Sequence, residues 1–386
     1  MTDDFSLFDT PVERVGTGSL KWARYAGREV LPMWVADMDF RAAQPIMDAL
    51  HRRVDHGVFG YSVAHEGPAV AVCGHLRRVH GVEIDPSWIY WMPGMVVGLA
   101  QAATLAGEDG DEIMTFTPVY PPFLKVHKDA RRSLVKVPLA VNCGRYTFDF
   151  DAMEAAVTPR TRMVFLCSPH NPVGRVWTRA ELDALAEFCL RHDLLLISDE
   201  IHADLLLEPQ TAPHTTALKL EGDIRSRTIT LMAASKTYNI PGLGLCFAII
   251  PDEKLRRRFQ LTKNTFVAEI SPLSFHATEA AFNQCESWRQ SLCRYLRRNR
   301  DTIVHFLSEN APGVVMPHME STYLAWLDVR ALGLPQPASS HFEAYGLAMN
   351  NGADFGAPGT GFVRLNFGCP LSNLEEGLRR FKSALP

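Results

Sequence analysis

Short apolar runs alternate with stretches of helical periodicity through the middle of the chain. The runs that we predict as buried strands lie at residues 112–116, 133–137, 163–167, 194–198, 228–234 and 245–250. Between the third and fourth runs, residues 178–181 (TRAE) have the pattern of a helix capping box, and apolar residues follow at helical spacing. Strands that alternate with helices indicate βαβ connections. We therefore predict an α/β fold with a mostly parallel central sheet covered by helices.

Helical periodicity and turn residues divide the rest of the chain. Helices are predicted at 45–54, 70–80, 95–107, 253–266, 271–284, 286–309 and 339–348, and further strands at 322–329 and 362–367. Residues 1–45 lack a long helical pattern and are predicted to form an extended arm. Its tryptophans, Trp22 and Trp34, need apolar surface, which the chain itself, a pocket or a partner subunit could supply. We predict a large domain of residues 46–285 and a smaller α+β domain of residues 286–386, with the arm packing on the small domain.

Three polar side chains follow predicted strands at the point where each strand ends. They are Asn171, Asp199 and Lys236. Because ligands bind at the carboxyl ends of strands in such sheets, we expect these residues to share one edge. Lys236 lies between two buried strands, where desolvation would lower its pKa and make it a nucleophile toward a carbonyl group. The alternative is that it snorkels to the surface or pairs with a carboxylate.

Two further segments carry candidate binding groups. The Pro93-Gly94 turn precedes a helix, so its free backbone N–H groups and the helix dipole suit a phosphate, although most such turns are only caps. Arg364 interrupts an apolar strand, and its planar fork could hold a carboxylate at two points. Tyr120, in the rigid loop 119–123, could be a core residue.

Composition excludes several classes of function. The 386 residues are 47% hydrophobic and 21% charged with a net charge of -4, which gives no reason to expect nucleic acid or an anionic membrane as a partner. No apolar run approaches the roughly 18 residues that span a bilayer. The acidic start lacks the apolar stretch of a signal peptide. The eight cysteines include no CxxC pair, so we predict reduced core cysteines, no metal site and a cytoplasmic protein.

Several segments together resemble one protein family. Residues 168–174 (SPHNPVG), 198–202 (SDEIH), 235–239 (SKTYN) and 362–366 (FVRLN) occur in the order found in fold-type I, class I/II pyridoxal-phosphate aminotransferases. Three more segments, 31–40 (LPMWVADMDF), 119–123 (VYPPF) and 364–370 (RLNFGCP), resemble the cystathionine β-lyase branch typified by the MalY and PatB C–S lyases. The resemblance covers nearly the whole chain.

The resemblance implies a role for each of five residues. Lys236 would form the Schiff base with pyridoxal 5′-phosphate and take the Cα proton of the substrate. Asp199 would pair with the pyridine nitrogen, although such a carboxylate is also common as a helix cap. Asn171 would contact the ring O3′ and the substrate, or be only a turn residue. Arg364 would hold the substrate α-carboxylate, and Tyr120 would stack on the ring.

The same resemblance implies how the phosphate is held. Gly94, Met95 and Val96 would cradle it at the start of their helix, with Ser235 beside them. Tyr61 matches a tyrosine that in this family reaches the phosphate of the neighbouring subunit, which implies a homodimer.

Two positions depart from the pattern of aspartate-aminotransferase-like enzymes. These enzymes carry a serine three residues before the lysine and an arginine eight residues after it, where this chain has Ala233 and Gly244. The missing arginine argues against a standard aminotransferase phosphate site. It leaves Ser235 as the substitute.

The activity implied by the resemblance is a C–S β-lyase reaction. The substrate would be L-cystathionine or a related S-substituted cysteine, and the products pyruvate, ammonia and a thiol, with a place in methionine biosynthesis. One alternative is a class I/II aminotransferase, which needs the same lysine, aspartate and arginine. A further alternative is a regulatory or binding protein built on the same fold.

Overall fold

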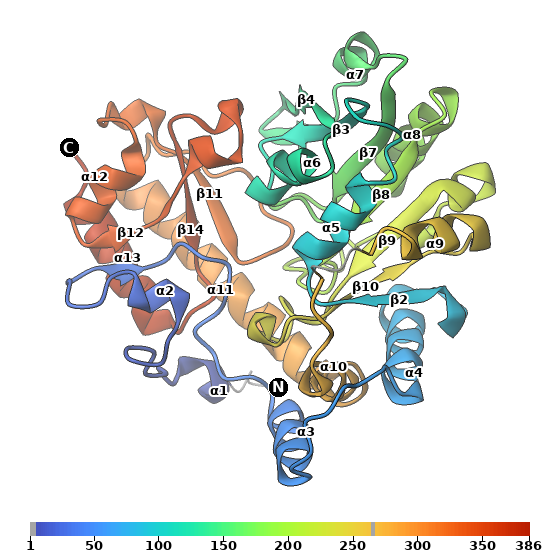
Figure 1. Cartoon of the computed structure of the whole chain (residues 1–386). Coiled ribbons are helices and arrows are strands. Elements are labelled where there is room, and N and C mark those ends of the chain that lie inside the picture. The colour runs from blue at the N-terminus through green and yellow to red at the C-terminus, as the bar shows by residue number, and fades with distance from the viewer. Residues whose placement is uncertain (1–4, 264–266) are drawn as a thin grey trace.

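The computed structural model describes residues 5–263 and 267–386, arranged around a seven-stranded sheet (Figure 1). The sheet order is β2-β10-β9-β8-β7-β3-β4. Its strands are β2 (Ile89–Met92), β3 (Glu112–Thr117), β4 (Ser133–Pro138), β7 (Thr161–Cys167), β8 (Leu195–Asp199), β9 (Thr228–Met232) and β10 (Cys246–Ile249). Neighbours from β9 to β4 are parallel, and β10 runs antiparallel to both β9 and β2. The predicted, mostly parallel α/β sheet is confirmed.

Helices cover both faces of this sheet. Val164 and Phe165 are adjacent in β7 but belong to different buried clusters, because successive side chains of a strand point to opposite faces. The cluster around Phe165 includes residues of α5 (Met95–Ala103), α6 (Val126–Asp129) and α9 (Glu253–Gln260). The cluster around Val164 includes residues of α7 (Phe150–Ala156) and α8 (Arg179–Arg191). Burial on both faces explains why these strands are continuous apolar runs in the sequence.

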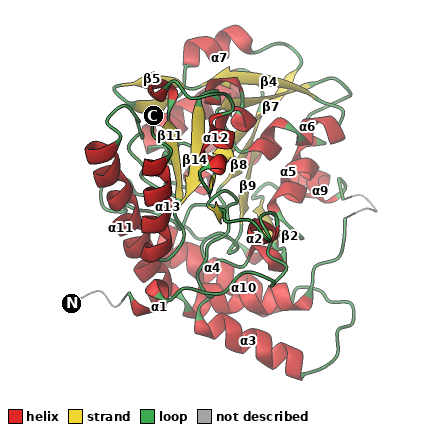
Figure 2. Ribbon diagram, turned by 90° about the vertical axis from the view of Figure 1, so that its left-hand side faces the viewer, coloured by secondary structure: helices red, strands yellow, loops and turns green. Residues whose placement is uncertain are grey.

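A third group of helices packs beside β10. They are α3 (Gln44–Asp55), α4 (Glu66–His75) and α10 (Pro272–Gln284), and Figure 2 shows α3 and α10 lying side by side. After α4 one π-helical turn, Leu76–His80, ends at Gly81, whose φ of 61° is left-handed. The expected helix 253–266 ends at Gln260, and its last three residues lie outside the described part of the chain.

The C-terminal elements and the arm form another core. The long helix α11 (Glu286–Asn310) and α13 (Leu371–Ser383) pack with a small sheet of order β11-β14-β13. The strands are β11 (Leu324–Asp328), β13 (Asn350–Asn351) and β14 (Phe362–Asn366). Phe8, Met33 and Phe40 of the arm are buried in this core, and the blue arm runs along the red C-terminal elements in Figure 1. The division into two domains and an arm stays a prediction.

The predicted helix at 339–348 is wrong at its end. The helix α12 (Ala338–Ala344) stops early because Gly346 takes a left-handed φ of 81°. The following strand β12 (Leu347–Ala348) pairs in parallel with β1 (Leu31–Pro32) of the arm. The arm also contains the short helices α1 (Ser6–Asp9) and α2 (Leu20–Ala23), and a hairpin of β5 (Ala140–Asn142) and β6 (Arg145–Thr147) lies elsewhere in the chain. Among the helices of the described residues, none is both long and apolar enough to cross a membrane.

Candidate active site

A cavity of about 360 Å³ opens at the carboxyl ends of β7, β8 and β9. Its walls contain ten residues that bear on the site, namely Gly94, Met95, Val96, Tyr120, Asn171, Asp199, His202, Ser235, Lys236 and Ala36. The parallel strands end together at this edge, which brings segments far apart in the sequence to one place. Eight of the ten are residues that the sequence singled out.

Lys236 lies in the turn that follows β9, with its ammonium group inside the cavity. Its Nζ donates a hydrogen bond of 2.6 Å to the backbone carbonyl of Ala36 in the arm. Burial and the positive charge of Arg364 lower the pKa of Lys236 to about 8, although the nearby carboxylates of Asp37 and Asp199 raise it. A lysine that is partly neutral near this pH can act as a nucleophile or a base.

Asp199 is the last residue of β8, and its carboxyl group is buried. Burial raises the pKa of Asp199 to about 7, while a hydrogen bond from the backbone N–H of Ile201 to Oδ1, 3.1 Å long, lowers it. A cationic partner would relieve this desolvation cost. The protonated pyridine nitrogen of pyridoxal phosphate is such a partner, so the carboxyl group fits the ring end of the cofactor.

The segment around Asp199 is held in place from behind by a second carboxylate. Glu200 Oε1 accepts hydrogen bonds from the backbone N–H of Ala217 at 2.7 Å and from the Ser198 hydroxyl at 3.0 Å. Glu200 Oε2 lies 2.9 Å from Nε2 of His214, and both side chains are buried. These contacts hold Glu200, the neighbour of Asp199 in the chain, in place.

Arg364 projects from β14 and is buried without a carboxylate partner among the described residues. Its Nη1 donates to Asn171 Oδ1 at 3.0 Å, and its Nη2 donates to Asn350 Oδ1 at 2.7 Å and to the Trp34 carbonyl at 3.0 Å. Within the same described residues Nε has no hydrogen-bond partner, and burial lowers the pKa of Arg364 to about 10. A buried guanidinium group bonded only to neutral acceptors can stabilise an anionic ligand.

The other end of the cavity suits a phosphate. Gly94, Met95 and Val96 form the start of α5, where backbone N–H groups lack intrahelical partners, and Ser235 lies on the same cavity wall. A Cβ atom at Gly94 would meet nothing within 4 Å in the described part of the chain, which leaves room for a ligand beside the backbone. The residues therefore fit the phosphate of the cofactor.

Gly244 gives a physical reason for the missing arginine. Its φ of 55° is left-handed, and a Cβ atom there would lie 3.0 Å from the Pro93 carbonyl oxygen. A larger residue would push against the turn that precedes α5. Ala233, at the other departing position, is a buried residue next to β9.

Tyr120 and Asn171 come from adjacent loops that are joined by a backbone hydrogen bond. The N–H of Tyr120 donates to the carbonyl of Asn171 at 3.0 Å. Both residues line the cavity, so the tyrosine ring is available to a planar ligand. The Asn171 amide oxygen is taken by Arg364, which leaves its NH₂ group to face other partners.

Tyr61 is not brought to the cavity within one chain. It lies in the loop between α3 and α4, and its side chain is fully exposed. Its neighbours Val58, Phe59 and Val63 are also largely exposed, which is unusual for so many apolar side chains in succession.

Sequence reasoning missed His202 and Ala36. His202 lies three residues after Asp199; it is buried, its Nδ1 has no hydrogen-bond partner among residues 5–263 and 267–386, and burial lowers its pKa to about 3. The segment SDEIH contained this histidine, so its spacing from Asp199 was an available signal. Ala36 contributes only its backbone carbonyl. Every residue has this group, so the amino-acid sequence could not single out Ala36. That carbonyl also accepts a hydrogen bond of 3.0 Å from the Tyr323 hydroxyl.

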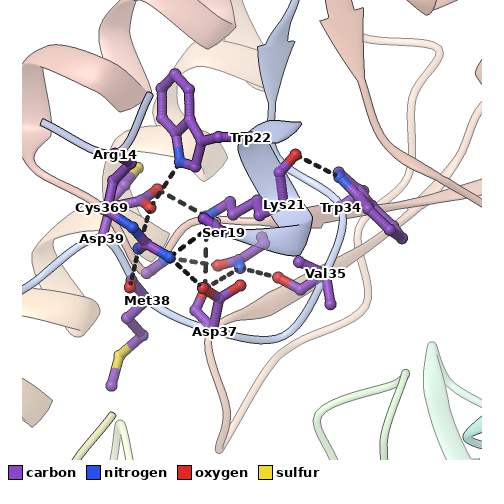
Figure 3. Close-up of polar contacts among 12 residues, drawn as sticks. Arg14, Ser19, Lys21, Trp22, Trp34, Val35, Asp37, Met38, Asp39 and Cys369 are labelled. Atoms are coloured by element: carbon purple, nitrogen blue, oxygen red, sulfur yellow. Dashed lines mark hydrogen bonds and ion pairs between the residues drawn. The ribbon is translucent and has the colours of Figure 1, made fainter. Parts of the chain in front are cut away.

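Residues 34–38 of the arm, which we call the arm strap, lie across the site. Every backbone carbonyl of the strap accepts a hydrogen bond from a side chain elsewhere in the chain. In strap order the donors are Arg364, Asn366, Lys236 with Tyr323, Asn366 with Lys21, and Asn239 with Arg14. Figure 3 shows the charged residues Arg14, Lys21 and Asp39 beside the strap residues Asp37 and Met38. The strap therefore contacts both Lys236, the candidate base, and Arg364, the residue that could bind the substrate carboxylate.

Comparisons with known proteins agree with this geometry. The family described as aminotransferase class I and II matches residues 60–381. Cystathionine beta-lyase PatB of Bacillus subtilis is 38% identical over 98% of this chain and 99% of its own length. Protein MalY of Escherichia coli is 33% identical, with 98% of each chain covered.

Solved structures give the same result. The crystal structure of OvoB has a TM-score of 0.94 and 40% identity, with 98% of each chain covered. Cystalysin from Treponema denticola, which contains a pyridoxal 5′-phosphate cofactor, has a TM-score of 0.93 and 32% identity, also with 98% of each chain covered. The resemblance deduced from the sequence is confirmed. The chain belongs to the aminotransferase class I and II family, in the branch that contains PatB and MalY.

Proposed function

We propose that this chain is a pyridoxal-phosphate-dependent C–S β-lyase that cleaves L-cystathionine or related S-substituted cysteines. The observation that carries the proposal is that Lys236 and Asp199 line one cavity and Arg364 bonds Asn171 in its wall, in a chain 38% identical to cystathionine beta-lyase PatB. The products are pyruvate, ammonia and the thiol that leaves from Cβ.

Three side chains divide the chemistry. The bound cofactor supplies an electron sink that stabilises negative charge at the substrate Cα. Asp199 holds the pyridine nitrogen in its protonated form. Arg364 orients the substrate through its α-carboxylate, which fixes the Cα–H bond relative to Lys236.

Lys236 moves the protons. With a pKa of about 8, its amine is available as a base that takes the Cα proton. The Cβ–S bond then breaks with its electron pair on sulfur, and the Lys236 ammonium group can return a proton to the departing thiolate. Overall, one cystathionine and one water give homocysteine, pyruvate and ammonia.

The proposal includes an assembly and a cellular role. Tyr61 reaches the phosphate of the neighbouring subunit in a homodimer, which its full exposure and apolar neighbours support. Gly94, Met95, Val96 and Ser235 hold the same phosphate. The free cysteines suit a reducing cytoplasm, and homocysteine as the thiol product suits a role in methionine biosynthesis.

The test is a product assay on the purified holoenzyme with L-cystathionine as the sole substrate. We expect many turnovers of pyruvate per site without any 2-oxo acid. Lys236→Ala should abolish turnover, and borohydride should fix the cofactor on Lys236 in the unmodified protein, as mass spectrometry would detect. Lys128→Ala, at an exposed lysine, is the matched control and should change neither result.

Two outcomes would contradict the proposal. If product formation stops after one equivalent per site and resumes only when 2-oxoglutarate is added, the protein is an aminotransferase. If L-cystathionine is not turned over with or without 2-oxoglutarate, although the cofactor is bound, the result favours a regulatory or binding protein.

A further inference from the structure

A cleft of about 450 Å³ lies beside α3 and α10 and shares no lining residue with the active-site cavity. Its walls are formed by Ala49, Arg52, Arg53, His56 and His276. The neutral imidazole ring of a histidine is a common metal ligand in proteins. His276 connects this cleft to a second histidine and to a glutamate.

The three residues come from two helices that pack together. His276 and Glu279 are three residues apart on α10, so their side chains leave the same face of that helix. His65 directly precedes α4, which packs beside α10 (Figure 1). One possible ligand atom from each of the three residues lies within 4.8 Å of the other two. We call His65, His276 and Glu279 the α10 cluster.

The α10 cluster has ligand atoms that other contacts leave available. His65 Nε2 lies 2.8 Å from Glu279 Oε2, and the ring centroids of His65 and His276 are 4.9 Å apart. Within the described residues, His276 forms no hydrogen bond and Glu279 Oε1 has no ion-pair partner. The side chains of His65 and Glu279 are 45% and 33% exposed, so an ion from solvent can reach them.

A glycine brings the carboxylate to the start of α4. A Cβ atom at Gly67 would lie 2.5 Å from Glu279 Oε1, which is closer than any real contact of this kind. The lack of a side chain at Gly67 therefore lets Glu279 approach the first turn of α4. That approach places the carboxylate beside His65.

A buried group with the same types of side chain is a weaker candidate. His75 Nε2 and His80 Nε2 lie 2.9 and 2.8 Å from the two carboxylate oxygens of Asp204. These contacts already satisfy both oxygens, and all three side chains are buried. The α10 cluster differs because it is open to solvent and keeps one imidazole and one carboxylate oxygen free.

We propose that the α10 cluster binds a divalent transition-metal ion of the zinc class through His65, His276 and Glu279. Two imidazoles and one carboxylate are a ligand set that suits Zn²⁺ and leaves one coordination position open. Ligand atoms around a tetrahedral zinc ion lie about 3.3 Å apart. Small rotations of the half-exposed His65 and Glu279 side chains bring the atoms from their present separations to that distance.

The surrounding charges indicate what fills the open position. Arg52 and Arg53 line the cleft next to His276. A divalent ion with one glutamate leaves a positive charge close to these arginines. An anion from solvent, such as chloride, balances this charge as the fourth ligand.

The site is independent of the proposed lyase chemistry. Our expectation of no metal site rested on the cysteines, and the α10 cluster contains none. Its residues are too far apart in the sequence for a spacing motif to reveal them. Because His65 follows the loop that carries Tyr61, a bound ion ties the end of that loop to α10.

Calorimetric titration of the untagged, chelator-treated holoenzyme with zinc chloride tests the proposal. We expect one zinc ion per chain, and no binding of magnesium at the same concentration, because imidazole ligands favour zinc over magnesium. His276→Ala and Glu279→Gln should each weaken zinc binding by at least about tenfold, since even the loss of a group behind a metal ligand has that effect.

The matched control is His305→Ala. His305 is an exposed histidine of α11 that lies 3.3 Å from Glu309, so the variant removes a similar pair that is not part of the α10 cluster. Its affinity for zinc should equal that of the unmodified protein. Zinc should also slow amide hydrogen exchange at the start of α4 in the unmodified protein but not in His276→Ala.

Three results would overturn the proposal. The first is that the unmodified protein binds no zinc, which would make the contact of His65 with Glu279 an ordinary hydrogen bond. The second is equal affinity in His276→Ala, Glu279→Gln and the unmodified protein, which would place the ion elsewhere. The third is zinc binding without slower exchange at the start of α4. This last measurement needs only the unmodified protein, so it decides even if a variant does not fold.

Discussion

Burial at this site shifts the pKa values of single residues toward neutrality. Burial raises the pKa of Asp199 to about 7 and lowers the pKa of Lys236 to about 8, so the two titrate close together. The cofactor-free protein carries this desolvation cost because neither group has a full counter-charge. Perturbed groups that converge in a cavity are typical of active sites, where the bound ligand supplies the missing partner.

Asp199→Asn should stabilise the cofactor-free protein, and more at pH 8 than at pH 4. The native carboxyl group binds its proton more tightly than the unfolded one, since its pKa is raised from 3.8 to about 7. The free energy of unfolding therefore falls as the pH rises from the pKa of Asp199 in the unfolded chain through its pKa in the folded protein. Asparagine does not titrate, so the variant avoids this loss. At pH 8 we expect a gain on the order of 3 kcal/mol, measured from urea unfolding midpoints.

The control for this experiment is Asp151→Asn, which removes an exposed carboxylate. It should shift the midpoint little and equally at both pH values. If Asp199→Asn gives the same change at pH 4 and pH 8, the titration of Asp199 is not the source of the effect.

At the scale of elements, the start of α5 depends on a neighbouring turn. Gly244 approaches the Pro93 carbonyl so closely that a Cβ atom would lie 3.0 Å from that oxygen. The backbone turn at Pro93 leads directly into α5 and so sets where the N–H groups of Met95 and Val96 point. A glycine outside the helix thus determines the geometry of the candidate phosphate site.

Gly244→Ala and Gly144→Ala form a matched pair. Both glycines have left-handed φ, 55° and 75°, but a methyl group at Gly144 would meet no described atom within 4 Å. Each substitution should cost about 1 kcal/mol of stability for the left-handed backbone. Gly244→Ala should in addition weaken pyridoxal phosphate binding by about tenfold, or 1.4 kcal/mol. Absorbance titration of the cofactor measures the difference, and equal affinities in the two variants would contradict the role of Gly244.

At the scale of the whole molecule, the exposed loop between α3 and α4 marks a surface that one chain leaves uncovered. Tyr61 is fully exposed there, together with Val58, Phe59 and Val63. Contiguous exposed apolar side chains are typical of an interface between proteins. In the proposed homodimer, Tyr61 completes the site of the partner rather than its own.

Mixed dimers test this assembly. Lys236→Ala and Tyr61→Phe should each have little activity alone. Exchange of subunits should restore one intact site per mixed dimer, which is about a quarter of all sites in an equal, random mixture. Lyase activity before and after exchange is the measurement, with sedimentation to show the dimer. Activity that equals the sum of the two parents, or a fully active monomer, would remove the cross-subunit role of Tyr61.

The sequence by itself determined the sheet and much of the site. Continuous apolar runs predicted the strands because burial on both faces demands them, and the parallel order placed Asn171, Asp199 and Lys236 at one edge. These inferences depend on local patterns and on a general rule of α/β topology. Where a local signal competed with a long-range one, at residues 345–348, the helix prediction was wrong.

Only the tertiary structure decided how the arm meets the site. The carbonyl of Ala36 bonds Lys236 across 200 residues of sequence, and a backbone carbonyl is the same in every residue, so no side-chain pattern announces it. Whether a carboxylate pairs with Arg364 likewise depends on what packs around β14, and none of the described residues supplies one. Contacts between distant segments are set by the packing of the whole core, which is why the contacts of the arm with Lys236 and Arg364 became visible only in the folded chain.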